Sequence, residues 1–228
     1  MKLAALFSGG KDSLYATYLS IKAGHEIKYL ITFKPLRMDS YMFHHPCVEL
    51  TPLQAEAMGI KQIMVETGGE KEKELDDLEK ALAKMKSEID GVVSGALASN
   101  YQKTRIDNIC KKLGLESLAP LWKIDTEQYW KNLLENNFEI MITSVAAEGL
   151  DEKWLGRIMD NESIIELKKN SDRYGLNLGG EGGEYESFVI NAPFFKYKIK
   201  IIEANKIWNN VTMSGYLQIK DAILAPKS

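Results

Sequence analysis

Cysteine is scarce in this sequence. The two cysteines, Cys47 and Cys110, form no Cys-x-x-Cys pair, so the sequence supports neither a disulfide framework nor a cysteine-ligated zinc site. No apolar run approaches the roughly 20 residues that a membrane-spanning helix needs. The first apolar stretch, "LAALF", is too short for a signal peptide and is followed at once by glycines and charges. We therefore expect a cytoplasmic protein with no membrane partner.

A strong charge of either sign is also missing. The formal net charge is −3 at pH 7, which argues against salt-driven nucleic-acid binding over a broad surface, although a local basic groove is still compatible. No stretch rich in proline, glycine and serine marks a linker, and no segment repeats. The 228 residues are enough for a sizeable core. The oligomeric state is left open, and a homo-oligomer is one option.

The first half of the chain alternates short apolar runs with amphipathic segments. This alternation predicts a parallel sheet with right-handed helical crossovers and a ligand site at the carboxyl ends of its strands. Thr51 is expected to be a helix N-cap, because a proline and an apolar segment follow it. The predicted strands are residues 3–7, 27–33, 62–67, 91–96 and 115–122, and the predicted helices are residues 12–24, 51–59, 72–88 and 99–114.

The second half has a different pattern. Helical periodicity in "EQYWKNLLENN" and "ESIIELKKNSDRYG" flanks one strand, "EIMITSVA". Two alternating segments, 197–210 and 212–224, then resemble the arms of a hairpin. We therefore predict an α/β protein with two domains, in which residues 1–123 form a five-stranded parallel sheet and residues 124–228 a smaller α+β unit.

The stretch "FSGGKDS" joins the first predicted strand to the first predicted helix. A glycine-rich turn there points backbone N–H groups at one spot, at the positive end of a helix dipole, and so predicts a phosphate site. An aspartate beside phosphate is unusual unless it caps the helix or holds Mg²⁺. The competing interpretation is a helix cap with glycines that serve only the turn. The candidate phosphate ligands are Ser8, Gly9, Gly10, Lys11, Asp12 and Ser13.

A second polar patch follows the fourth predicted strand. Ser94 and Gly95 end that strand, and a glycine there allows a nucleotide to approach closely. Helical spacing places Tyr101 and Arg105 on one face, where Arg105 can bind phosphate by its bidentate fork. Lys103 is expected to point elsewhere into solvent. The alternative is an ordinary exposed start of a helix.

The acidic stretch "EGGEYES" is the third candidate. Its carboxylates, Glu181, Glu184 and Glu186, can converge on a cation or accept a proton from one, and Tyr185 offers an aromatic face. The alternative is an acidic surface turn. A further cluster in "GLDEKWLGR", with Asp151, Glu152 and Arg157, has an equal chance of being functional or structural, whereas the charged run 70–80 is typical of a solvated helix face.

These motifs carry a resemblance. "SGGKDS" is neither a Walker A loop nor a GxGxxG turn, but it is similar to the pyrophosphate-binding loop of the ATP pyrophosphatase superfamily. Together with "SGALASNYQKTRIDNIC", "PLW", "GLDEKWLGR" and "GGEGGEYESF", it resembles diphthine–ammonia ligase in a short form. The resemblance implies a sheet of the adenine nucleotide alpha hydrolase type, with ATP bound by residues 1–123 and the substrate by residues 124–228.

The resemblance also implies an activity and its partners. ATP with Mg²⁺ would activate the carboxylate of diphthine on elongation factor 2, and ammonia would form the amide, with AMP and pyrophosphate released. Asp12 is the expected magnesium ligand, and the backbone near Thr32 and Phe33 the expected adenine contact. The expected catalytic residues are Asp12, Glu181, Glu184 and Glu186, and the expected substrate contacts are His44, Gly182, Gly183 and Tyr185.

Two other functions stay open. A related enzyme that modifies transfer RNA is disfavoured by the two isolated cysteines and the acidic balance, and we expect no nucleic-acid partner. A non-enzymatic sensor of adenine nucleotides would keep the glycine-rich turn but would not need "EGGEYES". A metal site at the adjacent histidines His44 and His45 is disfavoured, because neighbouring side chains cannot both face one ion without strain.

Overall fold

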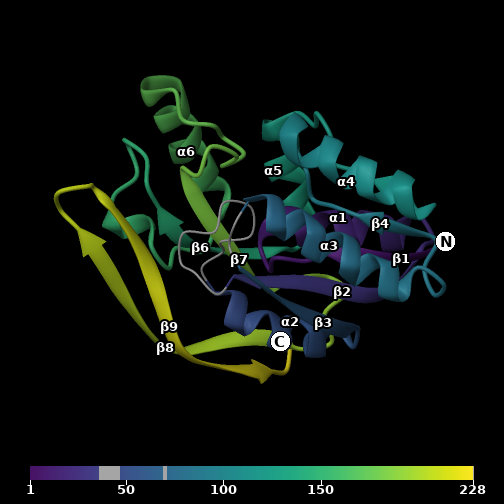
Figure 1. Ribbon diagram of the computed structural model, residues 1–228. Coiled ribbons are helices and arrows are strands. Elements are labelled where there is room, and N and C mark those ends of the chain that lie inside the picture. Colours follow the sequence, from purple (N-terminus) through teal and green to yellow (C-terminus); the bar gives the residue numbers. More distant parts are fainter. Residues whose placement is uncertain (36–46, 69–70, 228) are drawn as a thin grey trace. The chain divides into compact units, whose positions relative to one another are not determined.

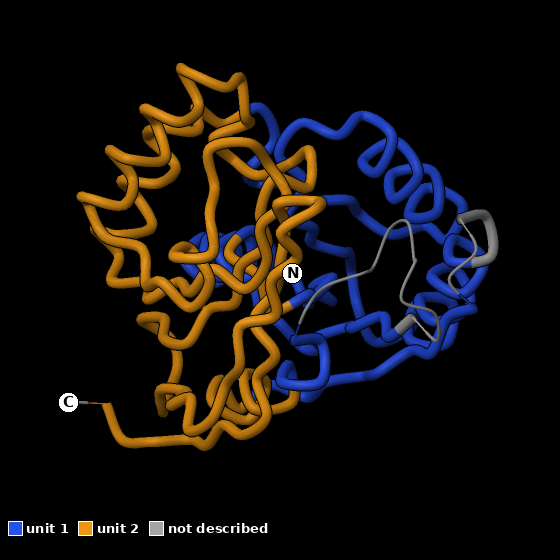
Figure 2. The backbone as a smooth tube through the Cα atoms, turned by 90° about the vertical axis from the view of Figure 1, so that its left-hand side faces the viewer, with its two compact units in different colours: residues 1–8, 12–51, 60–123 blue, residues 9–11, 52–59, 124–228 orange. Residues whose placement is uncertain are grey.

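The computed structural model describes residues 1–35, 47–68 and 71–227. The chain divides into two compact units (Figure 2). The first unit comprises residues 1–8, 12–51 and 60–123, and the second comprises residues 9–11, 52–59 and 124–228. Two short segments from the first half of the sequence therefore belong to the second unit.

The first unit contains a five-stranded parallel sheet with the order β3-β2-β1-β4-β5. The chain leaves the central strand β1 toward one edge through β2 and β3, then crosses to the other side for β4 and β5. The strands are β1 (Lys2–Leu6), β2 (Glu26–Pro35), β3 (Lys61–Thr67), β4 (Gly91–Val93) and β5 (Glu116–Leu118). The helices of this half of the sequence are α1 (Lys11–Lys22), α2 (Thr51–Met58), α3 (Lys71–Met85) and α4 (Asn100–Leu113), with a 3-10 turn at Val48–Leu50.

Both faces of this sheet are covered. The neighbouring residues Leu30 and Ile31 of β2 point to opposite faces and are both fully buried. Leu78 of α3 and Ile109 of α4 pack in one cluster with Ile31, while α1 lies on the opposite side of the sheet (Figure 1). Burial on both faces explains why the inner strands β1 and β4 are almost continuously apolar, whereas the edge strands β3 and β5 carry polar, partly exposed residues.

The second unit contains a four-stranded antiparallel sheet with the order β7-β6-β9-β8. Strands β8 and β9 form a long two-stranded ribbon (Figure 1). Asp125 and Asp160 cap α5 and α6, because their carboxylates accept hydrogen bonds from backbone N–H groups of the first turn. The elements are α5 (Thr126–Glu135), β6 (Glu139–Val145), a 3-10 turn at Glu152–Trp154, α6 (Asn161–Tyr174), β7 (Tyr185–Asn191), β8 (Lys198–Asn209) and β9 (Ser214–Ala225).

The predicted fold class is confirmed, since a parallel α/β sheet and a separate antiparallel sheet are both present. The fourth and fifth strands are shorter than predicted. The expectation of Thr51 as an N-cap is wrong: its backbone is helical, and its hydroxyl donates to the Val48 carbonyl at 2.7 Å because a 3-10 turn leads directly into α2. The charged run 70–80 is not solvated throughout, because Glu74 is fully buried.

Candidate functional site

The glycine-rich turn follows β1, where the strand order changes direction. β1 pairs with β2 on one side and β4 on the other, and ligands of open α/β sheets bind at such a point beyond the carboxyl ends of the strands. Gly9 has φ = 82°, a left-handed conformation that favours glycine, and α1 begins two residues later at Lys11. The predicted strand, turn and helix start are therefore observed, and such an arrangement suits an anion.

The two serines of the turn contact each other. The Ser8 backbone N–H and hydroxyl lie 3.3 and 3.2 Å from the Ser13 hydroxyl oxygen. Ser13 is buried, and Ser8 is half-buried. The turn is thus closed by its own side chains within the first unit.

Gly95 is close to the same turn for a structural reason. A Cβ atom built at Gly95 would lie 2.6 Å from the Asp12 carbonyl carbon and 2.7 Å from the Ser13 nitrogen. The start of α1 therefore occupies the space that a side chain would need. The preceding residue, Ser94, is buried and donates its N–H to the Leu118 carbonyl at 2.9 Å. The approach of a nucleotide to Ser94 and Gly95 stays a prediction.

Thr32 and Phe33 lie in β2 just beyond the last residue paired with β1, and both are buried. The Thr32 hydroxyl donates to the Phe7 carbonyl at 2.8 Å and accepts from the Gln62 amide at 2.7 Å. The Thr32 side chain thus fixes the place where β1 ends. Contact of the backbone here with adenine stays a prediction.

On α4, Tyr101 and Arg105 share one face as predicted. The Arg105 guanidinium carbon lies 3.4 Å from the centre of the Tyr101 ring. Lys103, expected in solvent, instead lies 2.5 Å from the Asp107 carboxylate. Burial raises the pKa of Asp107, but the hydrogen bonds from Lys103 and Ser117 outweigh it, so the pKa lies below its usual value.

Lys11 differs most from the sequence-based expectation. Its side chain is only 3% exposed, and its ammonium donates to the Gly179 carbonyl at 2.7 Å. The same ammonium lies 5.9 Å from the ring centres of Tyr129 and Trp130 and 5.4 Å from that of Tyr185. An ammonium among aromatic rings is a favourable cation–π arrangement. Lys11 is therefore held within the second unit, to which it belongs, and its contact with phosphate stays a prediction.

The backbone of residues 9–11 is held in the same unit. The Gly9 carbonyl accepts from the Val189 N–H at 3.1 Å and from the Gln54 amide at 2.9 Å. The Lys11 N–H lies 3.2 Å from the Ser187 hydroxyl oxygen. Sequence reasoning missed Gln54 and Ser187. A single glutamine within the apolar segment "TPLQAEAMG" was the available signal for Gln54, which is fully buried.

The three glutamates of "EGGEYES" have different surroundings. Glu184 accepts from the backbone N–H groups of Gly182 at 2.7 Å and Asn177 at 2.9 Å, so its carboxylate fastens the loop. A Cβ atom at Gly182 would lie 2.7 Å from a Glu184 carboxylate oxygen, so a side chain there would displace this carboxylate. Glu181 is exposed, and Glu186 is half-buried in β7. Catalysis by these three carboxylates stays a prediction.

Tyr185 lies on the buried face of the second sheet. Its hydroxyl donates to the Leu178 carbonyl at 2.7 Å, and its ring faces the Lys11 ammonium. Contact of this ring with a substrate cation stays a prediction and would require Lys11 to move. The neighbouring Gly183 has φ = 83° and supplies the turn before β7. His44 lies outside the described residues.

The cluster in "GLDEKWLGR" is explained by structure. Asp151 caps the 3-10 turn through a 3.0 Å bond from the Lys153 N–H. Arg157 pairs with Glu166 at 2.5 Å and stacks on the buried Trp154. The cap by Asp151 and the stacking of Arg157 on Trp154 support the structural interpretation of this cluster.

Comparison with known proteins assigns the family. A sequence model described as the diphthamide synthase N-terminal domain matches residues 1–117, and one described as the C-terminal domain matches residues 125–225. This chain belongs to the diphthamide synthase family. The resemblance inferred from the motifs is confirmed.

Curated relatives of this family member are named diphthine–ammonia ligase. The human protein is 37% identical over 91% of this chain and 85% of its own length. The rat protein is 39% identical over 88% of this chain and 83% of its own length. The fission yeast protein is 30% identical over 98% of this chain, which spans 40% of that longer protein.

A solved structure titled a predicted subunit of tRNA methyltransferase from Methanocaldococcus jannaschii is also similar to this family member. It has a TM-score of 0.47 and 16% identity, and the match covers 84% of this chain and 97% of that one.

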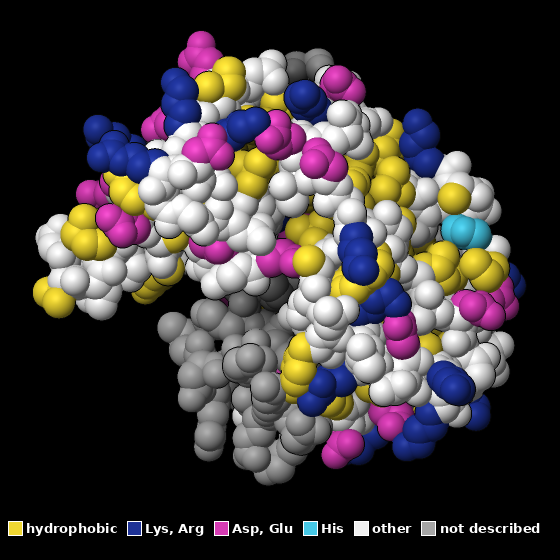
Figure 3. Space-filling model, turned by 90° about the horizontal axis from the view of Figure 1, so that it is seen from above, with side chains coloured by type: hydrophobic (Ala, Val, Ile, Leu, Met, Phe, Trp, Pro, Cys, Tyr) yellow, Lys and Arg dark blue, Asp and Glu magenta, His cyan; other side chains and the backbone are white. Residues whose placement is uncertain are grey.

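On the molecular face that Figure 3 shows, cationic and anionic side chains are intermixed. The absence of a nucleic-acid partner stays a prediction.

The described residues show neither a cluster of metal ligands nor a membrane-spanning helix. Among them, no group of three or more His, Cys, Asp or Glu side chains could hold a metal ion. None of the described helices combines the length and apolarity that a membrane crossing requires. Binding of magnesium by Asp12 stays a prediction.

Proposed function

We propose that this chain uses ATP to convert the carboxylate of diphthine on elongation factor 2 into an amide, with ammonia as nitrogen donor. The observation that carries this proposal is the match of both family models across nearly the whole chain, with relatives named diphthine–ammonia ligase. The glycine-rich turn supports it, because a helix start after a parallel strand at the switch point suits a polyphosphate.

The reaction has two bond-forming steps. A carboxylate oxygen of diphthine attacks the α-phosphorus of ATP, and the bond to the bridging oxygen breaks so that pyrophosphate leaves. Nitrogen of ammonia then attacks the activated carbonyl carbon, AMP leaves, and the nitrogen loses a proton. Negative charge grows on the leaving pyrophosphate, so fixed N–H donors near it lower the barrier.

We assign the residues as follows. Ser8, Gly9, Gly10, Lys11 and Ser13 bind the phosphates, and Mg²⁺ held by Asp12 would supply charge neutralisation there. Thr32, Phe33, Ser94, Gly95, Tyr101 and Arg105 contribute to nucleotide binding. Glu181 and Glu186 accept protons from ammonium or from the tetrahedral intermediate. Glu184 shapes their loop through its two bonds to backbone N–H groups.

The test is an assay with ATP, ammonium and diphthine-bearing elongation factor 2. Mass spectrometry should show a loss of about one mass unit on the factor, the change from acid to amide, and chromatography should show AMP. Asp12→Ala should lower AMP formation by at least about 100-fold, because a phosphate or magnesium contact is lost. Turnover with transfer RNA alone, or nucleotide binding with no AMP, would reject the proposal.

Glu186→Ala separates the two halves of the reaction. We expect amide formation to fall by at least about tenfold, because a proton acceptor is lost. The dissociation constant for ATP, measured by calorimetry, should stay within about twofold of the wild type. Full amidation by Glu186→Ala would remove this residue from the catalytic set.

A further inference from the structure

One row of side chains crosses the whole antiparallel sheet of the second unit. Glu186 of β7 lies opposite Ser144 of β6, Ser144 lies opposite Tyr216 of β9, and Tyr216 lies opposite Ile207 of β8. Residues directly opposite each other in an antiparallel pair point to the same face. The four side chains therefore share one face, and Glu186 is at one end of the row.

This face is the open one. Tyr216 and Ile207 are each 40% exposed, and Ser144 and Glu186 are half-buried. The next residues along β6 and β7, Val145 and Tyr185, point to the other face and are buried. The row thus faces away from the core of the second unit.

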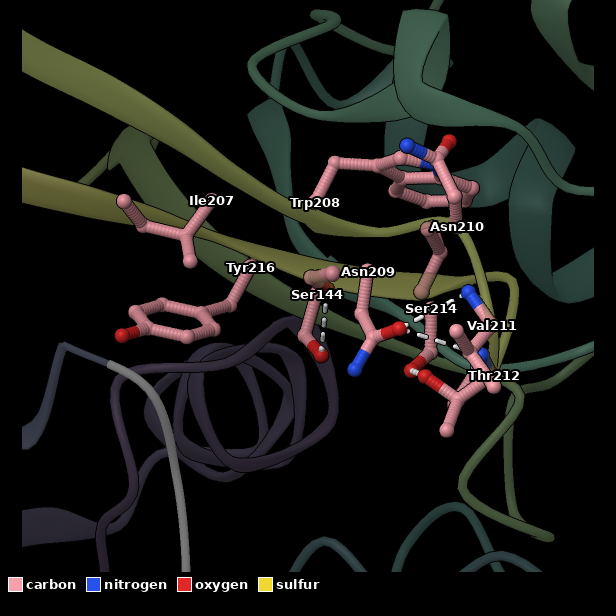
Figure 4. Close-up of a pocket in the computed structure, with 12 residues that line it drawn as sticks. Ser144, Ile207, Trp208, Asn209, Asn210, Val211, Thr212, Ser214 and Tyr216 are labelled. Carbon is pink, nitrogen blue, oxygen red and sulfur yellow. Dashed lines mark hydrogen bonds between the residues drawn. The ribbon is translucent and has the colours of Figure 1, made fainter.

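A hollow of about 700 Å³ lies over three of the four residues of the row, and Glu186 is not among the residues that line it. It is lined by Ser144, Ile207 and Tyr216 and by the connection between β8 and β9 (Figure 4). The connection is held by Asn209, whose side-chain oxygen accepts from the backbone N–H groups of Val211 and Thr212. The volume is in the range of small-ligand sites, so it suits a long modified side chain better than a folded partner surface.

The chemistry of the hollow suits a cation of low hydration. None of the 12 residues that line it is a lysine or arginine. An aromatic ring attracts a quaternary ammonium through its face, and the carboxylate of Glu186 lies two strands away from that ring in the same row. Apolar side chains and neutral amide and hydroxyl groups complete the lining, so no second charge is desolvated there.

We propose that this hollow binds the trimethylammonium-bearing side chain of diphthine, with Tyr216 as the aromatic contact. The proposal rests on the function proposed above and names the substrate subsite. In diphthine the quaternary nitrogen and the carboxylate are attached to the same carbon, so a cation held near Tyr216 keeps the reacting carboxylate within the same row as Glu186. The hollow therefore selects the modified histidine over an unmodified one by its fixed charge.

The first experiment changes the ring. Tyr216→Ala should raise KM for diphthine-bearing elongation factor 2 by about 5- to 30-fold, the range expected for loss of a cation–π contact, and leave KM for ATP within about twofold. Tyr216→Phe keeps the ring, so its KM for diphthine-bearing elongation factor 2 should stay within about threefold of the wild-type value. Tyr197→Ala is the matched control, because Tyr197 is also exposed and does not line the hollow.

The second experiment changes the charge. Ile207→Lys places a cation opposite Tyr216 and should raise KM for the modified factor, whereas Ile207→Glu should leave it equal or lower. Equal KM values for the two variants, or a Tyr216→Ala variant that matches Tyr197→Ala, would overturn the proposal. A rise in KM for ATP alone would overturn it as well.

A third measurement is independent of turnover. Tetramethylammonium titrated into the wild type should shift the NMR resonances of the Tyr216 ring and of the Ile207 methyl groups, which line the same hollow. The Tyr216→Ala variant should lose the shift at Ile207. No shift at that ring would overturn the subsite. A wild type that shows the shift but forms no amide would instead reject the proposed function.

Discussion

The two sheets of this protein use their surfaces differently. In the parallel sheet of the first unit, adjacent residues such as Leu30 and Ile31 are both fully buried. In the antiparallel sheet of the second unit, the adjacent residues Tyr216 and Leu217 are 40% and 6% exposed. A sheet covered on both faces can offer a ligand only its strand ends, whereas a sheet covered on one face can also offer the other face.

The glycine-rich turn contributes residues to both units. Residues 9–11 belong to the second unit, through the contacts of Gly9 with Val189 and Gln54 and of Lys11 with Gly179. The loop that carries Glu181 and Glu184 is in that unit too. Part of the proposed phosphate site and the acidic loop are therefore held by one packed body.

The largest expected effect tests the contrast between the sheets. Leu30→Ala and Ile31→Ala should each lower the free energy of unfolding by about 2–5 kcal/mol, because each leaves a cavity on a covered face. The loss of unfolding free energy for Leu217→Ala should lie in a similar range, and the loss for Tyr216→Ala should be no more than about 1 kcal/mol. Urea denaturation measures all four. An equal loss of unfolding free energy for Tyr216→Ala and Leu217→Ala would contradict the claim that Tyr216 lies on an uncovered face of the second sheet.

An intermediate effect is expected at Lys11. Lys11→Met keeps the apolar stem but leaves the buried Gly179 carbonyl without this donor, which should cost about 1–3 kcal/mol. Hydrogen exchange should also quicken in residues 179–185, because the loop loses its anchor. Both measurements are made without nucleotide, so a phosphate contact does not contribute.

Lys22→Met is the matched control for Lys11. Lys22 lies in the same helix, with its ammonium 5.6 Å from the Tyr18 ring, but it is exposed. Its replacement should change stability by less than about 0.5 kcal/mol. The anchoring role is rejected if the two variants lose the same stability and show the same exchange.

The smallest effect is pH-dependent and belongs to the second unit. Hydrogen bonds from the Ser163 hydroxyl and N–H lower the pKa of Asp160, the N-cap of α6. A carboxyl group whose pKa is lower in the folded than in the unfolded state stabilises the folded protein at pH values above the unfolded pKa of about 4. This contribution is lost as the pH falls through the pKa of the folded state. Asp160→Ala should cost about 1 kcal/mol at pH 7.

The titration itself is isolated by Asp160→Asn, which can still cap the helix but has no charge. The difference in unfolding free energy between wild type and this variant should be constant from pH 5 to 7 and shrink below about pH 4. Denaturation midpoints across that range measure it. A difference that grows toward low pH would have the wrong sign for this assignment.

Much of the fold was predictable because it depends on local pattern. Continuous apolar runs followed by glycine indicated the buried parallel strands, and alternating runs indicated the ribbon of β8 and β9. The shared face of Tyr101 and Arg105 followed from helical spacing alone. Thr51 was misassigned, because a preceding 3-10 turn depends on contacts that no local signal reveals.

By itself the sequence determined the order of the elements, the glycine-rich turn after β1 and the family. Only the tertiary structure decided that Lys11 points among Tyr129, Trp130 and Tyr185, that Glu184 fastens its own loop, and that Glu186, Ser144 and Tyr216 lie in one row. The physical reason is sequence distance. Periodicity and capping act over a few residues, whereas a buried cation and a strand register are set by partners from remote parts of the chain, whose packing alone brings them into contact.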